Sequence, residues 1–149
     1  IELYRLYEYD NMVLRKGNND WDMPTQSQQN SSYAGMRQFR AFNENCYLTA
    51  HAGETYDNIA REIGISAHKL AKYNERPEDA PLSEGEIVWL RKKQRHVPEN
   101  FGKQYHTVRS NESLYDISQQ YGVRLKNIMK ANRKIVKRGI KTGDRVVLP

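Results

Sequence analysis

The residue types that most often carry catalysis are present in this chain, but their spacing does not build an active site. The four histidines, His51, His68, His96 and His106, do not have the spacing of a metal site. Acidic residues are plentiful, yet glycosidase chemistry needs two carboxylates that face each other across a cleft, about 5–10 Å apart. No phosphate-binding loop and no nucleophile elbow occurs in the sequence. We therefore expect no catalytic residue, no metal and no cofactor in this chain.

The single cysteine adds no further chemistry. With only Cys46 the chain has no internal disulfide framework, and one cysteine does not define a redox compartment. Cys46 comes directly before an expected strand, where a small buried side chain is a far commoner role than a nucleophile.

The most informative feature of the sequence is an internal repeat at an offset of 58 residues. Residues 47–90 align with residues 105–148 without a gap, and the same residue recurs at ten of the forty-four pairs, among them Gly64/Gly122. Identities of that number at one offset indicate two copies of one small module.

Each copy opens with a strand and a helix. A short alternating run, Tyr47–His51 or Tyr105–Arg109, predicts a strand. Thr55 and Ser113 are good N-cap residues for a helix that follows. That helix is predicted from apolar positions at i, i+3, i+4 and i+7. These positions are Tyr56, Ile59, Ala60 and Ile63 in the first copy, and Leu114, Ile117, Ser118 and Tyr121 in the second.

A second helix follows in each copy. Gly64 and Gly122 are expected to end the first helix in the left-handed conformation. Asn74 and Asn132 are expected to end the second helix in the same way. The second helix is predicted over Ser66–Tyr73 and Arg124–Ala131, with Leu70 and Tyr73, or Leu125, Ile128 and Ala131, in the core.

The copies close with a turn around Gly85 or Gly143 and a strand ending at Leu90 or Leu148. The order is therefore strand, helix, helix, strand. Two strands so far apart in sequence pair only if the helices fold over one face of the sheet. The expected fold class is α+β, with two small β-α-α-β units, and each unit of about 45 residues should be only modestly stable.

This pattern resembles the LysM module. The first copy supplies Gly53-Glu54-Thr55-Tyr56, Ile59-Ala60, Asn74 and Gly85-Glu86 at the positions of the family pattern. The second copy supplies Asn111-Glu112-Ser113-Leu114, Ile117-Ser118, Asn132 and Gly143-Asp144. Asn111 departs from the family glycine, and Glu86 and Asp144 depart from the family glutamine.

The resemblance implies binding of glycans that contain N-acetylglucosamine, chiefly peptidoglycan and chitin. It places the sugar in a shallow groove between the first strand–helix loop and the second helix–strand loop, which is too shallow to enclose a distorted sugar for hydrolysis. In the first copy the implied glycan-binding residues are Gly53, Glu54, Thr55, Tyr56, Arg76, Pro77, Glu78, Asp79, Ala80, Pro81 and Leu82. In the second copy they are Asn111, Glu112, Ser113, Leu114, Lys134, Ile135, Val136, Lys137, Arg138, Gly139 and Ile140. The capping residues among them are needed for folding whether or not a sugar binds.

The first third of the chain leads to the repeats. We expect residues 1–12 to be the terminal helix of a preceding domain and residues 13–35 to be a linker rich in Asn, Gln, Ser and Gly. Met36–Phe42 alternates and a turn at Asn43-Glu44-Asn45 follows, so a hairpin should add a strand to the first module. The expected modules span residues 36–92 and 105–149, with a linker at 93–104. The arrangement resembles the C-terminal region of peptidoglycan-hydrolysing glucosaminidases.

Charge distinguishes the two copies. Residues 47–90 carry a net charge of −4, and residues 105–149 carry +7. Lys134, Lys137, Arg138 and Lys141 follow the second helix of the basic copy. They either favour an anionic polymer or form a solvated surface. No nucleic-acid motif accompanies them, so nucleic acid is not an expected partner.

The leading hypothesis is a monomeric, non-catalytic segment that holds an attached hydrolase on peptidoglycan or another N-acetylglucosamine polymer in the cell envelope. Two alternatives remain: a spacer or docking segment without sugar binding, and, less favoured, a glycosidase in its own right. No apolar run reaches the ~20 residues of a membrane span. The chain begins with Ile and has no signal peptide, which favours a processed chain or a fragment.

Overall fold

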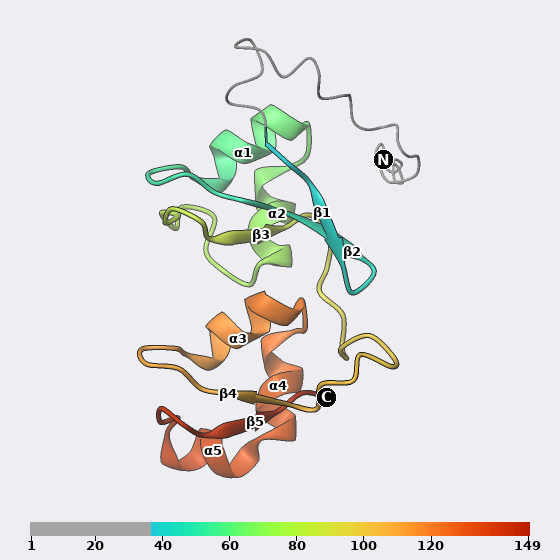
Figure 1. The fold of residues 1–149 in the computed structure, drawn as a ribbon. Coiled ribbons are helices and arrows are strands. Elements are labelled where there is room, and N and C mark those ends of the chain that lie inside the picture. Colours follow the sequence, from blue (N-terminus) through green and yellow to red (C-terminus); the bar gives the residue numbers. More distant parts are fainter. Residues whose placement is uncertain (1–36) are drawn as a thin grey trace. The chain divides into compact units, whose positions relative to one another are not determined.

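The computed structural model describes residues 37–149, and residues 38–149 form one compact unit (Figure 1). The helix expected over residues 1–12 and the linker expected over 13–35 lie outside the described residues. The described elements are a mixture of short helices and short strands, arranged as two β-α-α-β units. The predicted α+β class is confirmed.

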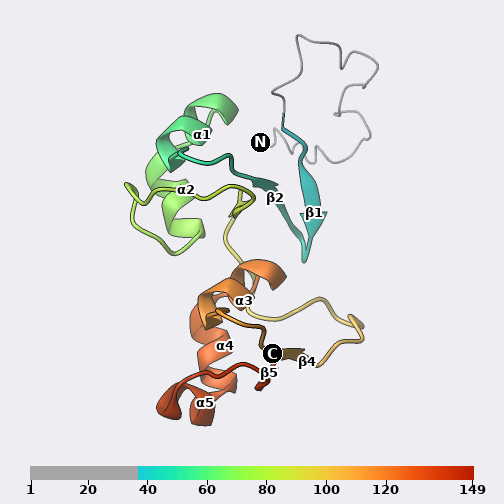
Figure 2. The ribbon, with the colours of Figure 1, turned by 60° about the vertical axis from the view of Figure 1, so that its left-hand side comes forward.

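The first module contains the strands β1 (Arg40–Phe42), β2 (Asn45–Thr49) and β3 (Ile87–Trp89) and the helices α1 (Tyr56–Ile63) and α2 (Ala67–Tyr73). The second module contains β4 (Tyr105–Thr107), α3 (Leu114–Tyr121), α4 (Leu125–Ala131), α5 (Arg133–Arg138) and β5 (Arg145–Val147). In both modules the helices cover one side of the sheet, as the two views show (Figures 1 and 2).

Both sheets are antiparallel. The first has the order β1-β2-β3, with Leu48 opposite Val88, and the second pairs β4 with β5, with His106 opposite Val146. The expected hairpin is present, since β1 pairs with β2. Asn43 and Glu44 at its turn have φ values of 52° and 56°. This pair of left-handed residues suits the right-handed twist of a hairpin.

Local chemistry sets the boundaries of α1 and α3. Thr55 and Ser113 each accept a hydrogen bond from the backbone three residues on, and Asn58 and Asp116 return the bond, so both helices begin with a capping box. Gly64 and Gly122 end these helices with φ values of 79° and 63°. These expectations are confirmed.

The expected left-handed caps at Asn74 and Asn132 are wrong. Their φ values are −96° and −132°, so neither residue adopts the left-handed backbone conformation. Instead the Asn74 side chain donates to the carbonyls of Leu70 and Trp89, at 2.8 and 2.9 Å, and accepts from the Trp89 amide at 2.7 Å. Asn132 makes the same three bonds in the second module. Each asparagine therefore ties the end of a helix to the last strand, and both are buried.

Other expectations about burial need correction. Ala131 is exposed, and Tyr73 and Leu125 are only half-buried. Cys46 is half-buried and lies inside β2 rather than before it. A loop is expected after the second helix of the second copy, but this segment contains the further helix α5. Ala131 is the last residue of α4, directly before α5.

Each module has its own apolar core. Leu48, Ile59, Leu70 and Val88 are central to the first. Ile117, Val123, Ile128 and Val146 are central to the second. These residues are at most 1% exposed, as the repeat leads one to expect.

The residues expected to form a linker at 93–104 are in contact with the second module. The Gln94 amide donates to Gly122 O at 2.9 Å, and the Arg124 amide donates back to Gln94 O at 2.8 Å. Val97 and Phe101 pack against the second core. These contacts hold the connecting segment on the second module as folded structure.

The two modules also contact each other directly. The Trp89 ring is fully buried, and its Nε1 donates to Gln119 O at 2.9 Å. Lys93 Nζ is buried beside it and donates to Ser118 Oγ, Gln119 Oε1 and Glu75 Oε1, at 2.6–2.8 Å. Burial lowers the pKa of Lys93, and the nearby Glu75 carboxylate partly restores it.

Candidate functional site

In the first module the two loops expected to bind glycan lie against each other. The Gly53 amide donates to Leu82 O at 3.2 Å, and the Leu82 amide donates to Glu54 O at 3.0 Å. The loop between β2 and α1 is thereby joined to the loop between α2 and β3. The residues that the family resemblance selects in this copy are brought together at one edge of the module.

These first-module residues divide into a buried floor and an exposed rim. Tyr56, Ala80 and Leu82 are buried, and burial raises the pKa of the Tyr56 phenol to about 12. The phenol therefore stays uncharged at neutral pH. The exposed rim consists of Gly53, Pro77, Glu78, Asp79 and Pro81, with Glu54 and Thr55 half-exposed. Arg76 is also partly exposed, so the accessible surface consists of the rim together with part of the Arg76 side chain.

Arg76 anchors the second loop of the first module. It forms an ion pair with Glu86 and donates to Pro81 O at 3.3 Å. Burial alone would lower the pKa of Arg76, but the hydrogen bond and charge of Glu86 outweigh it, and the pKa is raised. Arg76 thus holds the loop in shape while part of its guanidinium remains exposed.

In the second module the corresponding loops are arranged differently. Asn111 takes the left-handed conformation, with φ 62°, which Gly53 takes in the first copy. Within the described residues, no backbone hydrogen bond joins the 111–114 loop to residues 134–140. Ile135 and Ile140 pack against the core, and Leu114 does so too. Lys134, Val136, Lys137, Arg138 and Gly139 are exposed.

Glu112 and His106 form a polar cluster below the first loop of the second module. His106 is 2% exposed, and its Nε2 lies 2.8 Å from Glu112 Oε1 while its Nδ1 lies 2.8 Å from Tyr121 Oη. Burial would raise the pKa of Glu112, but donors from Arg109, His106 and Gln120 lower it to about 2. His106 therefore packs in the core and orders this loop.

The Thr55 and Ser113 hydroxyls are engaged in folding. Each accepts the hydrogen bond of its capping box. A sugar that contacted either hydroxyl would compete with the helix cap. Their backbone groups are engaged as well, because each amide donates to the side chain three residues on and each carbonyl accepts from the amide four residues on. Both residues therefore serve the helix start.

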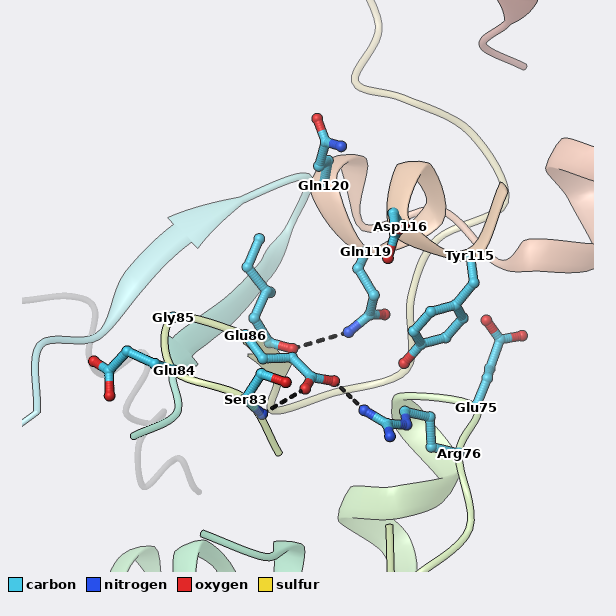
Figure 3. A pocket seen from close by; sticks show the side chains of 11 residues that line it. Glu75, Arg76, Ser83, Glu84, Gly85, Glu86, Tyr115, Asp116, Gln119 and Gln120 are labelled. Atoms are coloured by element: carbon cyan, nitrogen blue, oxygen red, sulfur yellow. Dashed lines mark hydrogen bonds and ion pairs between the residues drawn. The ribbon is translucent and has the colours of Figure 1, made fainter. Parts of the chain in front are cut away.

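Sequence reasoning missed a pocket between the first module and α3. A pocket of about 750 Å³ lies where the second loop of the first module meets α3. Figure 3 shows Tyr115 and Gln119 of α3 pointing toward Arg76 and Glu86. Gln119 Nε2 donates to Ile87 O at 2.9 Å and to Asn74 Oδ1 at 3.1 Å. The Tyr115 hydroxyl donates to Asn74 O at 2.7 Å.

A signal for this pocket was present in the repeat. Tyr115 and Gln119 replace Asp57 and Arg61 of the first copy, which are exposed and pair with each other. An aromatic ring and an amide at helix positions that are otherwise charged suggest contact with another part of the protein. The repeat positions at which the two copies differ in residue type therefore indicate the outer face of α3 as a contact surface.

Among residues 37–149 no group of His, Cys, Asp and Glu side chains is arranged to hold a metal ion. None of the helices in the same part of the chain has the length and apolar character needed to cross a membrane.

Two solved structures resemble the chain over part of its length. One is the spore cortex-lytic enzyme SleL of Bacillus cereus, with 23% identity and a TM-score of 0.29. The other is SleL of Bacillus megaterium QM B1551, with 26% identity and a TM-score of 0.28. Each match covers 69% of this chain but only 22% of the SleL chain. No curated protein matches this sequence.

The family comparison covers both copies of the repeat. The model of the LysM domain matches residues 49–91 and 106–149, which together are more than half of the chain. LysM domains are binding modules for glycans that contain N-acetylglucosamine, and they are not catalytic. The strand–helix–helix–strand order, the capping boxes and the paired loops of the first module agree with this match, and the chain belongs to the LysM family.

Proposed function

We propose that this chain is a non-catalytic glycan-binding segment that retains an attached cell-wall hydrolase on peptidoglycan or on chitin-type polymers. The observation that carries the proposal is the pairing of the two first-module loops through Gly53, Glu54 and Leu82, in a chain with two LysM domains. The attached enzyme is proposed from the glucosaminidase resemblance. A cell-envelope location follows from the same proposal.

The physical basis is recognition by backbone groups on a rigid rim. An N-acetyl group presents one amide and one methyl group, and it needs a polar partner and a small apolar surface. The exposed Gly53 region and the Pro77 and Pro81 rings offer both in the first module. In the second module the exposed Val136 offers apolar surface. Two weak sites on one chain increase retention on a polymer through effective concentration.

The test is a pull-down on insoluble peptidoglycan and on chitin, combined with an assay for new reducing ends. We expect retention on at least one polymer and no release of soluble fragments. Release of fragments by residues 1–149 alone would contradict the non-catalytic proposal. Failure to bind either polymer would favour a spacer or docking segment.

Individual sites are tested by matched substitutions in the two grooves. Gly53→Trp in the first module and Asn111→Trp in the second place a bulky ring at the same position of each rim. We expect each to weaken binding of short N-acetylglucosamine oligomers at its own groove. A variant that binds like the unaltered chain identifies a groove that does not bind sugar.

A further inference from the structure

The pocket between the modules lies next to both proposed grooves. It is lined from the first module by the Arg76 region and by Ser83–Glu86, which continue the second loop of the first groove. It is lined from the second module by Tyr115 and Asp116, which directly follow Leu114 of the second groove. The pocket therefore occupies the space between two loops that we propose to bind sugar.

The pocket is built by groups with fixed positions. Gln119 is 5% exposed, and its Nε2 donates to two oxygens of the first module while its Oε1 accepts from Lys93 Nζ. Tyr115 is held at its hydroxyl by Asn74 O, and Lys93 Nζ lies 5.3 Å from the centre of its ring. Glu86 is fixed by Arg76 and by the Ser83 amide. A pocket with held walls loses little conformational entropy when a ligand enters it.

Several polar groups of the pocket remain available for a ligand. Among the described residues, Ser83 Oγ makes no hydrogen bond, and Asp116 uses only Oδ2, which accepts from the Ser113 amide at 2.8 Å. Gln120 uses its Nε2 as a donor to Glu112 at 2.6 Å, and its amide oxygen makes no bond. Most of these free atoms are hydrogen-bond acceptors. They suit a ligand rich in hydroxyl and amide donors, such as a sugar ring.

The charge of the pocket limits which sugar can enter. Of its four carboxylates, Glu86 is paired with Arg76 and Glu75 with Lys93. Among the described residues Asp116 has no cationic partner, and Glu84 lies near only one basic group, His51 Nδ1, at 3.8 Å. The remaining negative charge disfavours a ligand that carries a carboxylate, because like charges repel more strongly where solvent is partly excluded.

We propose that this junction pocket is a third sugar subsite, which takes an amino-sugar residue without a negative charge and links the two grooves along one glycan chain. The proposal rests on the glycan-binding function proposed above. It requires both modules, since neither lines the pocket alone. A glycan long enough to leave the first groove gains contacts in the junction before it reaches the second.

The test uses the full chain and N-acetylglucosamine oligomers of increasing length, measured by isothermal titration calorimetry. We expect affinity to keep rising once the oligomer is longer than one groove. Ser83→Trp fills the pocket from an exposed position whose side chain bonds to nothing. It should leave short-oligomer affinity unchanged and weaken the longest oligomer by about tenfold, as expected for a few lost hydrogen bonds.

Lys141→Trp is the matched control, because Lys141 occupies the same repeat position in the second module and does not line the pocket. It should retain the gain with length. Equal gains in Ser83→Trp and the unaltered chain overturn the junction subsite, even if short oligomers bind. Absence of short-oligomer binding in the unaltered chain instead overturns the proposed function itself.

A second arm tests the charge argument. Oligomers in which sugars carry free carboxylates are compared with neutral oligomers of the same length. We expect the gain that Ser83→Trp removes to be absent for the carboxylate-bearing series. A gain of the same size in both series overturns the preference for an uncharged sugar.

Discussion

The first helices of the two modules, α1 and α3, share their length, their cap type and their apolar core positions, yet their outer faces are used differently. Asp57 and Arg61 of α1 are exposed and pair with each other. Their counterparts on α3, Tyr115 and Gln119, contact the first module. The residues that the repeat keeps therefore define the fold of one module, and the residues that it changes define how the modules join.

The last strands differ in the same way. Trp89 of β3 is fully buried against the second module, whereas Val147, at the same repeat position in β5, is 39% exposed. A third difference lies in the cores, where Leu48 of the first copy is replaced by His106, which binds Glu112 and Tyr121. The second module thus depends on polar contacts at a position where the first depends on apolar packing.

The largest effect on stability is expected at Trp89, compared with Val147 at the same repeat position. Trp89→Ala removes a buried ring and its hydrogen bond to Gln119, and should lower the free energy of unfolding by about 3–5 kcal/mol. Val147→Ala should change it by less than about 1 kcal/mol, because that side chain is exposed. Urea unfolding followed by circular dichroism measures both. Similar losses in the two variants would mean that the modules do not share a buried interface.

The helix-ending glycines offer a second comparison. A Cβ at Gly122 would lie 2.9 Å from the Trp89 ring, whereas a Cβ at Gly64 would meet nothing within 4 Å. Both residues have positive φ, so each alanine variant costs about 1 kcal/mol in backbone strain. Gly122→Ala should cost about 1–3 kcal/mol more, because the ring must move. Thermal unfolding of both variants measures the loss of stability. Equal losses for Gly64→Ala and Gly122→Ala would show that Trp89 does not need the space at Gly122.

The polar cluster of the second module should make its stability depend on pH. Glu112 has a pKa of about 2 in the folded state, below the ordinary 4.5, so its stabilisation is complete above pH 4.5 and is lost as the pH falls toward 2. Between pH 6 and pH 3 the stability advantage over Glu112→Gln should shrink by about 2 kcal/mol. Glu54→Gln, at the same position of the first copy, is the control. An advantage that does not change with pH would contradict the depressed pKa.

The smallest effect is expected from salt. The second copy has a net charge of +7, and Lys126, Lys130, Arg133 and Lys137 surround a shallow groove beside the exposed Met129 and Val136. If this copy attracts anionic wall material, Lys130→Gln with Lys137→Gln should weaken sedimentation with sacculi a few-fold at low salt and not above about 0.5 M, where surface charges are screened. Neutral chitin oligomers are the control. If retention on sacculi does not change with salt, the basic residues around this groove form a solvated surface.

The repeat alone determined much of the fold. The capping boxes at Thr55 and Ser113, the left-handed Gly64 and Gly122 and the hairpin before the first module are local features, and each depends on residues a few positions apart. Local signals failed at Asn74 and Asn132, because an asparagine at a helix end also fits a left-handed cap. Their actual role, bonding to a strand fifteen residues away, depends on tertiary contacts.

The family resemblance selected the two loops of each module, and the structure brings those of the first together through Gly53, Glu54 and Leu82. It did not indicate that Ala80 and Leu82 would be buried beneath that rim, although the helical spacing already placed Tyr56 on an apolar face. Burial depends on how the helices cover the sheet, and the loop pattern alone contains no such information.

The sequence by itself determined that the chain has two copies of one small module, because identities at one offset and capping signals are properties of short segments. Only the tertiary structure decided that residues 93–104 are folded onto the second module, that Lys93 is buried and that a pocket forms between the modules. The reason is physical. A local pattern records the contacts inside one repeat, whereas the contacts of Trp89, Lys93 and Gln119 depend on the surface that the other repeat presents.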